Sequence, residues 1–155
     1  MEKNLIKLNK PLIYMMVGLP RSGKSTFVDL NLKEMLPIVS ADRLRLLIYG
    51  QKFWAPGEKL VWTIRSIIIK SLLEQGIDIV IDETNTTKER RREIIDLAKE
   101  YNYSVKAVII ETPKDICINR AKMEGDNNII PVIERMAEQF EEVDLDEVDY
   151  IYRYK

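Results

Sequence analysis

Histidine is absent from the 155-residue sequence, and cysteine occurs once, at Cys117. Without histidine, the chain cannot carry a Ser-His or Cys-His nucleophile, a phosphohistidine intermediate or a histidine-based zinc site. With a single cysteine it cannot form an intrachain disulfide, which is typical of proteins from a reducing cytosol. We predict that Cys117 serves as a small buried hydrophobic residue.

Long apolar runs are also missing. The first seven residues lack the apolar stretch of a signal peptide, and no uninterrupted run approaches the length of a membrane-spanning helix. We therefore expect a soluble, cytoplasmic protein with no membrane partner.

A strong net charge is missing as well, since the formal net charge is −1. Residues 1–130 carry 21 Lys and Arg against 17 Asp and Glu, whereas residues 131–155 carry 3 against 8. Any nucleic acid must therefore be met by local basic patches, and we expect its binding to be strongly salt-sensitive.

The sequence does contain a phosphate-binding pattern. Residues 18–26 match the P-loop spacing G-x-x-x-x-G-K-[ST], in which backbone N–H groups wrap phosphates, Lys24 reaches the outer ones and the Ser25 hydroxyl can ligate Mg²⁺. The N-terminus of the following helix adds positive potential. We predict ATP and Mg²⁺ as cofactors and assign nucleotide binding to Gly18, Leu19, Pro20, Arg21, Ser22, Gly23, Lys24, Ser25 and Thr26.

Segments with short apolar runs alternate along the chain with segments in which apolar residues recur at helical spacing. Buried strands are predicted over 11–17, 38–39, 77–81 and 105–110, with an edge strand over 148–154. Helices are predicted over 24–35, 41–49, 58–75, 87–101 and 114–122, and from about 131. The alternation predicts a single three-layer α/β domain over 1–155, with a parallel sheet of about five strands and helices on both faces.

Three further expectations concern side chains. The apolar residues of 58–75 form a stripe so wide that we expect extensive burial of this helix. We expect residues 90–92, three consecutive arginines, to be a solvated face rather than a phosphate track. Phe53 and Trp54 are predicted to anchor their loop rather than to stack on a base.

Chemistry-bearing residues follow the second predicted strand. Asp42 could serve as a general base, and Arg43 and Arg45 place two guanidiniums beside the expected phosphate pocket. A purely structural alternative is that Ser40 caps the next helix while Asp42 sits in its first turn.

The segment 82–85 follows the third strand. Asp82 resembles the acid that holds Mg²⁺ in P-loop enzymes, and Glu83 resembles the second acid with which ATPases orient a water. A simple turn, in which Thr84 and Asn85 make local side-chain bonds, is the alternative.

A third group lies near residues 120–130. Arg120 and Lys122 precede a polar loop over 125–128, and together they predict a lid whose cation meets the transferring phosphoryl group. A solvated helix face is the alternative. Residues 138–149 form an acidic C-terminal segment.

Four motifs in order, GLPRSGKST, VSADRLR, IDETN and NRAKMEGDNNIIP, resemble the kinase domain of phage-type polynucleotide 5′-kinases over roughly residues 12–140. The resemblance implies the P-loop kinase fold, with Asp42 deprotonating a 5′-hydroxyl and Arg120 acting from the lid. It also implies that Lys24, Ser25 and Mg²⁺ hold the ATP phosphates.

The resemblance further implies an acceptor site at Arg45, which contacts a phosphate, and we place Thr84 beside it. Besides Ser25, the residue implied to hold the metal is the acid after the third strand. This acid is Asp82 or Glu83, because members of the family differ by one position there. The lid departs from the phage pattern, because Glu124 stands where a second arginine would be.

The leading hypothesis is an ATP-dependent kinase acting on the 5′-hydroxyl of a DNA or RNA end. One alternative is a kinase of a nucleoside, metabolite or antibiotic. Another is an ATPase or switch module that transfers nothing, although no guanine-recognition tetrad is present.

Overall fold

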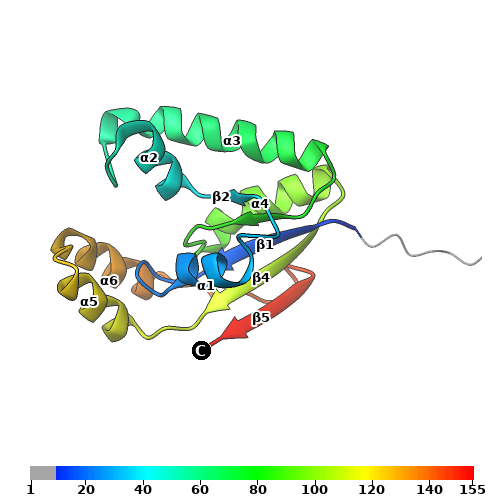
Figure 1. The fold of residues 1–155 in the computed structure, drawn as a ribbon. Coiled ribbons are helices and arrows are strands. Elements are labelled where there is room, and N and C mark those ends of the chain that lie inside the picture. Colours follow the sequence, from blue (N-terminus) through cyan, green and yellow to red (C-terminus); the bar gives the residue numbers. More distant parts are fainter. Residues whose placement is uncertain (1–9) are drawn as a thin grey trace, which may run out of the picture.

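A computed structural model describes residues 10–155 of the chain (Figure 1). Residues 1–9 lie outside the described part. The start of the domain predicted over 1–155 therefore lies outside the described residues. The first seven residues, in which we found no signal-peptide stretch, lie outside them as well.

Five strands form one sheet in the order β2-β3-β1-β4-β5, and every neighbouring pair is parallel. Met15 in the central strand lies opposite Ile81 on one side and Ala107 on the other. All carboxyl ends therefore meet at one edge of the sheet, as predicted. The strands are β1 (Leu12–Val17), β2 (Ile38–Val39), β3 (Ile79–Ile81), β4 (Ser104–Ile110) and β5 (Tyr150–Tyr154).

Helices cover both faces of this sheet, which confirms the predicted three-layer α/β architecture. Figure 1 shows α3 and α4 on one side of the strands and α1 on the other. The helices are α1 (Lys24–Asn31), α2 (Ala41–Tyr49), α3 (Glu58–Glu74), α4 (Lys88–Glu100), α5 (Lys114–Met123) and α6 (Ile130–Glu138), with short 3₁₀ turns η1 (Ala55–Gly57) and η2 (Asn127–Ile129).

Alternation along the strands builds two separate cores. In β1, Ile13 and Met15 face the core under α3 and α4, whereas Met16 faces the smaller core under α1. Because successive side chains point to opposite faces, a strand covered on both sides must be apolar throughout. The nearly continuous apolar run of residues 11–17 is therefore explained.

A third apolar cluster joins the helical pair α5–α6 to the P-loop. Leu19 of the P-loop packs with Cys117 and Ala121 from α5 and with Ile133 from α6. Cys117 is buried and free, as predicted. Within residues 10–155, no helix is long and apolar enough to cross a membrane.

The helix predicted over 24–35 is shorter than expected. It ends at Asn31 because Leu32 leaves helical geometry, with φ −126°, and the N–H groups of Leu32 and Lys33 both donate to the Val28 carbonyl. The chain then continues to Pro37 in irregular turns.

The expectation of extensive burial was wrong for α3. Its buried residues form one narrow stripe at intervals of four, Val61, Arg65, Ile69 and Leu73. Leu60 and Ile67 are 47% and 60% exposed, because α3 packs against the sheet and α2 and no further layer covers its outer face among the described residues.

The expectation for the three arginines of α4 was wrong for one of them. Arg90 and Arg92 are exposed, but Arg91 is completely buried. Its guanidinium pairs with Glu147 at 2.9 Å and donates to the carbonyls of Asn85, Glu141 and Glu142. Arg91 thus binds the loop after β3 to the acidic segment that precedes β5.

We predict that Arg91→Met destabilises the fold by about 3–5 kcal/mol, because it leaves the partly buried Glu147 carboxylate and several carbonyls without their partner. Arg90→Met, one residue away and exposed, should change the free energy of unfolding by less than about 0.5 kcal/mol. Urea denaturation followed by circular dichroism compares the two. Equal effects from both variants would contradict a buried structural role for Arg91.

Candidate active site

The P-loop connects β1 to α1 and depends on glycine at two positions. A Cβ at Gly18 would lie 2.9 Å from the Ser22 hydroxyl oxygen and 3.0 Å from the Ile110 carbonyl oxygen, so a side chain there would collide with the loop and with β4. Gly23 has φ +101°, in the region that favours glycine. These two residues let the backbone curl tightly enough to present its N–H groups to an anion.

Lys24 is a buried cation without a bonded carboxylate. It is 8% exposed, and its ammonium donates to the Leu19 carbonyl at 2.7 Å. Burial lowers the pKa of Lys24 to about 8, and the negative charges of Asp82 and Asp42 offset part of this effect. Among residues 10–155 no salt bridge satisfies Lys24, and an incoming phosphate would supply the missing negative charge.

Ser25 and Asp82 form the oxygen pair predicted for the metal. The Ser25 hydroxyl donates to an Asp82 carboxylate oxygen at 2.8 Å, and burial is the main cause that raises the pKa of Asp82. The described residues contain no group of three or more acidic, histidine or cysteine side chains that could hold a metal. A hydroxyl and one carboxylate suit Mg²⁺, which usually takes its remaining ligands from water and phosphates.

Glu83 points to a different partner. Both of its carboxylate oxygens accept hydrogen bonds from Arg65, one of them at 2.9 Å, and Arg65 also reaches Glu93 at 3.1 Å. Of the two acids considered for the metal, the structure therefore places Asp82 beside Ser25. Arg65 was not predicted as a site residue, although a single arginine within the apolar stripe of α3 indicates a buried ion pair.

The turn after β3 supports the P-loop. The Thr84 carbonyl accepts the Gly18 N–H at 2.9 Å, and the buried Asn85 side chain donates to the Met16 carbonyl at 2.9 Å. Asn85 therefore bonds across the sheet and not locally, and its φ of +46° is uncommon for a residue other than glycine.

Thr112, which follows β4, supports the same loop from the other side. Its hydroxyl donates to the Ser22 carbonyl at 2.7 Å. Thr112 was not predicted as a site residue, although its place shortly after a buried strand was a signal.

Asp42 lies in the first turn of α2, at the carboxyl end of β2. Ser40 caps this helix by accepting the Arg43 N–H at 3.3 Å, so the structural role considered for Ser40 is real. The Asp42 side chain remains 85% exposed and pairs with Arg45 at 2.7 Å. The first turn of α2 therefore has both a capping residue, Ser40, and an accessible carboxylate, Asp42.

Arg45 is held firmly beside Asp42. Two of its nitrogens donate to Glu58 at 2.7 Å each, and the Trp62 indole donates to the same carboxylate at 3.2 Å. A guanidinium has five N–H donors, and three are used by Glu58 and Asp42, so two remain. These bonds, Glu58 first, raise the pKa of Arg45, which keeps its charge.

Arg120 reaches the P-loop from α5. It donates to the Arg21 carbonyl at 3.0 Å and lies 3.6 Å from where a Cβ of Gly23 would be. Lys122 is exposed and forms no ion pair with another described residue. The predicted lid therefore contributes one cation, Arg120, at the phosphate cradle.

Trp54 anchors the loop between α2 and α3, as predicted. Its ring packs edge-on against Tyr49 at 4.9 Å, and a Cβ at Gly57 would lie within 2.8 Å of both rings. Trp54 remains 44% exposed and Phe53 is 63% exposed, so the anchoring role expected of Phe53 was wrong.

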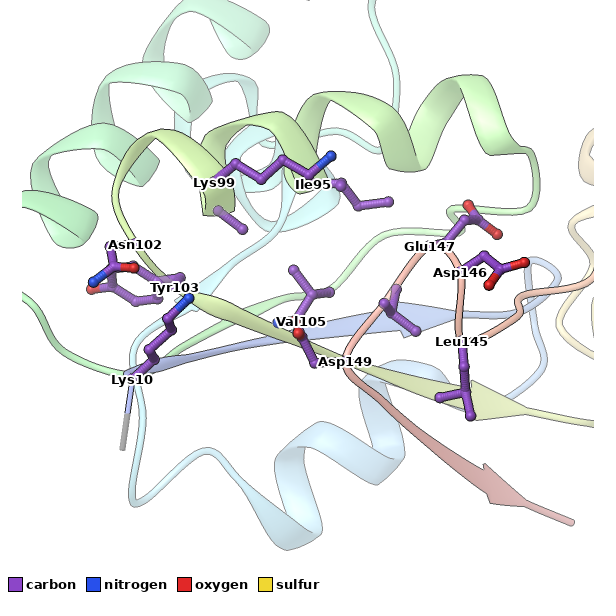
Figure 2. A pocket seen from close by; sticks show the side chains of 12 residues that line it. Lys10, Ile95, Lys99, Asn102, Tyr103, Val105, Leu145, Asp146, Glu147 and Asp149 are labelled. Atoms are coloured by element: carbon purple, nitrogen blue, oxygen red, sulfur yellow. Dashed lines mark hydrogen bonds between the residues drawn. The ribbon is translucent and has the colours of Figure 1, made fainter. Parts of the chain in front are cut away.

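The cavity of Figure 2 is a different feature, at the amino end of the sheet. It has a volume of about 350 Å³ and is lined by residues such as Lys10, Tyr103 and Asp149. Lys10 precedes β1, whereas the P-loop follows that strand, so this cavity takes no part in the phosphate site.

Lys24 yields a pH prediction for the nucleotide-free protein. Between its folded pKa of about 8 and the ordinary value of 10.5, the unfolded chain binds more protons, so this group makes stability rise with pH. The cost of burying its charge is fully present below pH 8. Lys24→Met should therefore be more stable than the wild type at pH 7, by up to about 3 kcal/mol, and this advantage should shrink towards pH 10.

Urea denaturation at pH 7, 8, 9 and 10 measures the difference in the free energy of unfolding. Lys33→Met, which changes an exposed lysine, is the control. The affinity of the wild-type protein for AMPPNP should fall as the pH rises above 8, because phosphate binding requires the ammonium form of Lys24. A Lys24→Met advantage that is constant over this range would contradict the lowered pKa.

Comparison with known sequences gives a family match over most of the chain. Residues 13–143 match the AAA_33 family, described as an AAA domain. L-seryl-tRNA(Sec) kinase of Methanococcus maripaludis is 25% identical over 138 residues, which cover 84% of this chain and 52% of that protein. The chain thus spans about half the length of this relative.

Solved structures share the fold. An RNA repair complex of Pnkp1, Rnl and Hen1 contains a chain with a TM-score of 0.70 at 19% identity, covering 91% of this chain and 49% of that one. A fungal RNA kinase has a TM-score of 0.67 at 17% identity, with coverage of 95% and 75%. The APS kinase CysC of Mycobacterium tuberculosis, in complex with AMPPNP and APS, has a TM-score of 0.60 at 16% identity. The match covers 94% of this chain and 88% of that one.

At these identities the likeness shows the fold alone, and the family match rests on the sequence. The chain belongs to the AAA_33 family and has the nucleotide-binding fold of a P-loop kinase.

Proposed function

We propose that this protein is an ATP- and Mg²⁺-dependent phosphotransferase that moves the γ-phosphate of ATP to the 5′-hydroxyl of a polynucleotide. The observation that carries the proposal is the pairing of Asp42 with Arg45 at 2.7 Å, at the edge of the sheet that also carries the P-loop. A carboxylate able to accept a proton stands there beside a cation able to hold an acceptor phosphate.

The donor half is formed by the P-loop. Its backbone N–H groups and Lys24 bind the ATP phosphates, and Ser25 and Asp82 hold Mg²⁺, which neutralises phosphate charge when bound. The buried ammonium of Lys24 suits this role, since it has a carbonyl and no carboxylate as its bonded partner.

The acceptor half is formed by α2. Arg45 contacts a phosphate of the acceptor strand with its two remaining N–H groups, and Glu58 and Trp62 keep its guanidinium in place. Thr84, at the end of the turn after β3, completes this side. A guanidinium held in this way loses little conformational freedom on binding.

In the transfer step, the 5′-hydroxyl oxygen of the acceptor attacks the γ-phosphorus and forms the new P–O bond. The bond between this phosphorus and the β,γ-bridging oxygen breaks, and ADP leaves. Asp42 takes the hydroxyl proton, while Arg120 faces the charge that spreads over the transferring group.

Two structural neighbours support a polynucleotide acceptor, because they are an RNA repair complex and an RNA kinase, whereas the relative by sequence is a kinase of a seryl group carried by a tRNA. The APS kinase supports the alternative of a small-molecule acceptor. The Asp42–Arg45 pair suits an acceptor that carries a phosphate near the attacking hydroxyl, as a polynucleotide end does. A single buried cysteine also suits a cytoplasmic protein.

We predict that Asp42→Asn lowers transfer of label from γ-labelled ATP to a 5′-hydroxyl oligonucleotide by about 10²–10⁴-fold, because the general base is lost. The KM for ATP should change less than about threefold. Asp29→Asn is the matched control, since Asp29 also pairs with an arginine of α2, at 2.8 Å from Arg43. Its activity should stay within about twofold of the wild type.

The same assay separates the alternatives. DNA and RNA oligonucleotides are tested beside a panel of nucleosides and phosphorylated metabolites, and transfer to the panel but never to an oligonucleotide would refute a polynucleotide acceptor. Acceptor-independent hydrolysis that is lost in Glu83→Gln and retained in Asp42→Asn would instead identify an ATPase. The engagement of Glu83 by Arg65 argues against that outcome.

A further inference from the structure

Arg21 occupies a conformation that disfavours its own side chain. It has φ +66°, in the left-handed region, although it is not glycine. Left-handed backbone at a residue with a Cβ costs conformational energy and persists where the surroundings hold it in place. A glycine would adopt this turn of the P-loop without strain, so the arginine side chain calls for a reason.

The guanidinium of Arg21 is engaged by two carboxylates from the lid. It pairs with Glu124 and with Asp126, the latter at 2.5 Å. This contact, first among several causes, lowers the pKa of Asp126. Asp126 also lies 3.4 Å from Lys52 of the loop after α2, so three segments meet at this point.

Arg21 also contacts the lid through its backbone. Its carbonyl accepts the Arg120 guanidinium at 3.0 Å, while its side chain binds Glu124, four residues further on. Residues four apart lie on one face of a helix. The end of α5 is therefore attached to the P-loop at two successive points on that face, and both attachments use Arg21.

The departure of the lid from the phage pattern has a counterpart in the P-loop. Glu124 replaces the expected second arginine, and the cation that faces it belongs to Arg21. The charge pair thus connects the two segments that flank the phosphate cradle, and it does so beside Arg120, whose guanidinium lies 3.6 Å from where a Cβ of Gly23 would be.

We propose that Arg21 is a positioning residue: by binding Glu124 and Asp126 it docks the lid so that Arg120 lies over the outer phosphate of a bound nucleotide. This inference rests on the nucleotide-binding half of the proposed function and is independent of the acceptor. Arg21 itself acts through Arg120.

The test is a double-mutant cycle between Arg21→Gly and Arg120→Ala in the full chain, with affinities for AMPPNP and ADP measured by calorimetry. Arg21→Gly suits φ +66°, so the thermal midpoint should stay equal or rise. Its affinity for AMPPNP should fall about tenfold and its affinity for ADP less than threefold, as in Arg120→Ala. In the Arg120→Ala background, Arg21→Gly should have no further effect.

Charge exchange provides the rescue. Arg21→Glu alone should weaken AMPPNP binding at least as much as Arg21→Gly, and Arg21→Glu combined with Glu124→Arg should recover most of the loss. Lys114→Ala, an exposed lysine at the start of the same helix, is the control and should leave both affinities unchanged.

Additive effects in the cycle, equal losses for AMPPNP and ADP, or unchanged AMPPNP binding in Arg21→Gly would each overturn the proposal. The measurement contains no acceptor, so a failure of 5′-hydroxyl transfer would not affect it. Conversely, additivity in the cycle would leave the transfer proposal intact.

Discussion

The buried ammonium group of Lys24 is the constraint around which the carboxyl edge of the sheet is arranged. A cation in a protein interior is costly unless its surroundings compensate, and here a carbonyl and two nearby acids do so only in part. The remaining deficit is what a phosphate group relieves. Because a triphosphate must also be wrapped by backbone N–H groups, the loop around Lys24 has to be held in a shape that it would not keep by itself.

That shape is maintained from three sides. The turn after β3 binds the start of the P-loop through Thr84 and the end of β1 through Asn85. Thr112, which follows β4, binds the middle of the loop, and Leu19 packs under the lid helices. Two of these supports come from the segments that follow β3 and β4 at the same edge of the sheet, and the third comes from the helices α5 and α6. The parallel topology therefore supplies both the chemistry-bearing residues and the residues that hold the loop.

Much of this arrangement was predictable because its signals are local. The glycine and lysine spacing of residues 18–26, the apolar strands and the polar residues that follow them indicate a P-loop fold, and the structure brings Asp82 and Arg120 to the P-loop. What could not be predicted depends on partners far along the chain. Helical spacing puts Arg91, and neither neighbouring arginine, on the buried face of α4 with Ile94 and Ile95, but its partner Glu147 lies 56 positions along the chain. Likewise, Glu124 is a visible departure from a motif, but its partner Arg21 is 103 residues away.

The central position of β1 has a consequence for the order in which the domain can form. This strand is the first of the sheet in the chain, yet its partners among the described residues are β3 and β4, and Thr112, which supports its P-loop, lies 90 positions after its partner Ser22. Such long-range pairing is slow and cooperative. During synthesis, the nucleotide-binding segment thus emerges early but gains its shape only after β4 has joined the sheet. ATP can therefore act as a ligand of the assembled domain and not of the nascent chain, and its binding stabilises the completed fold.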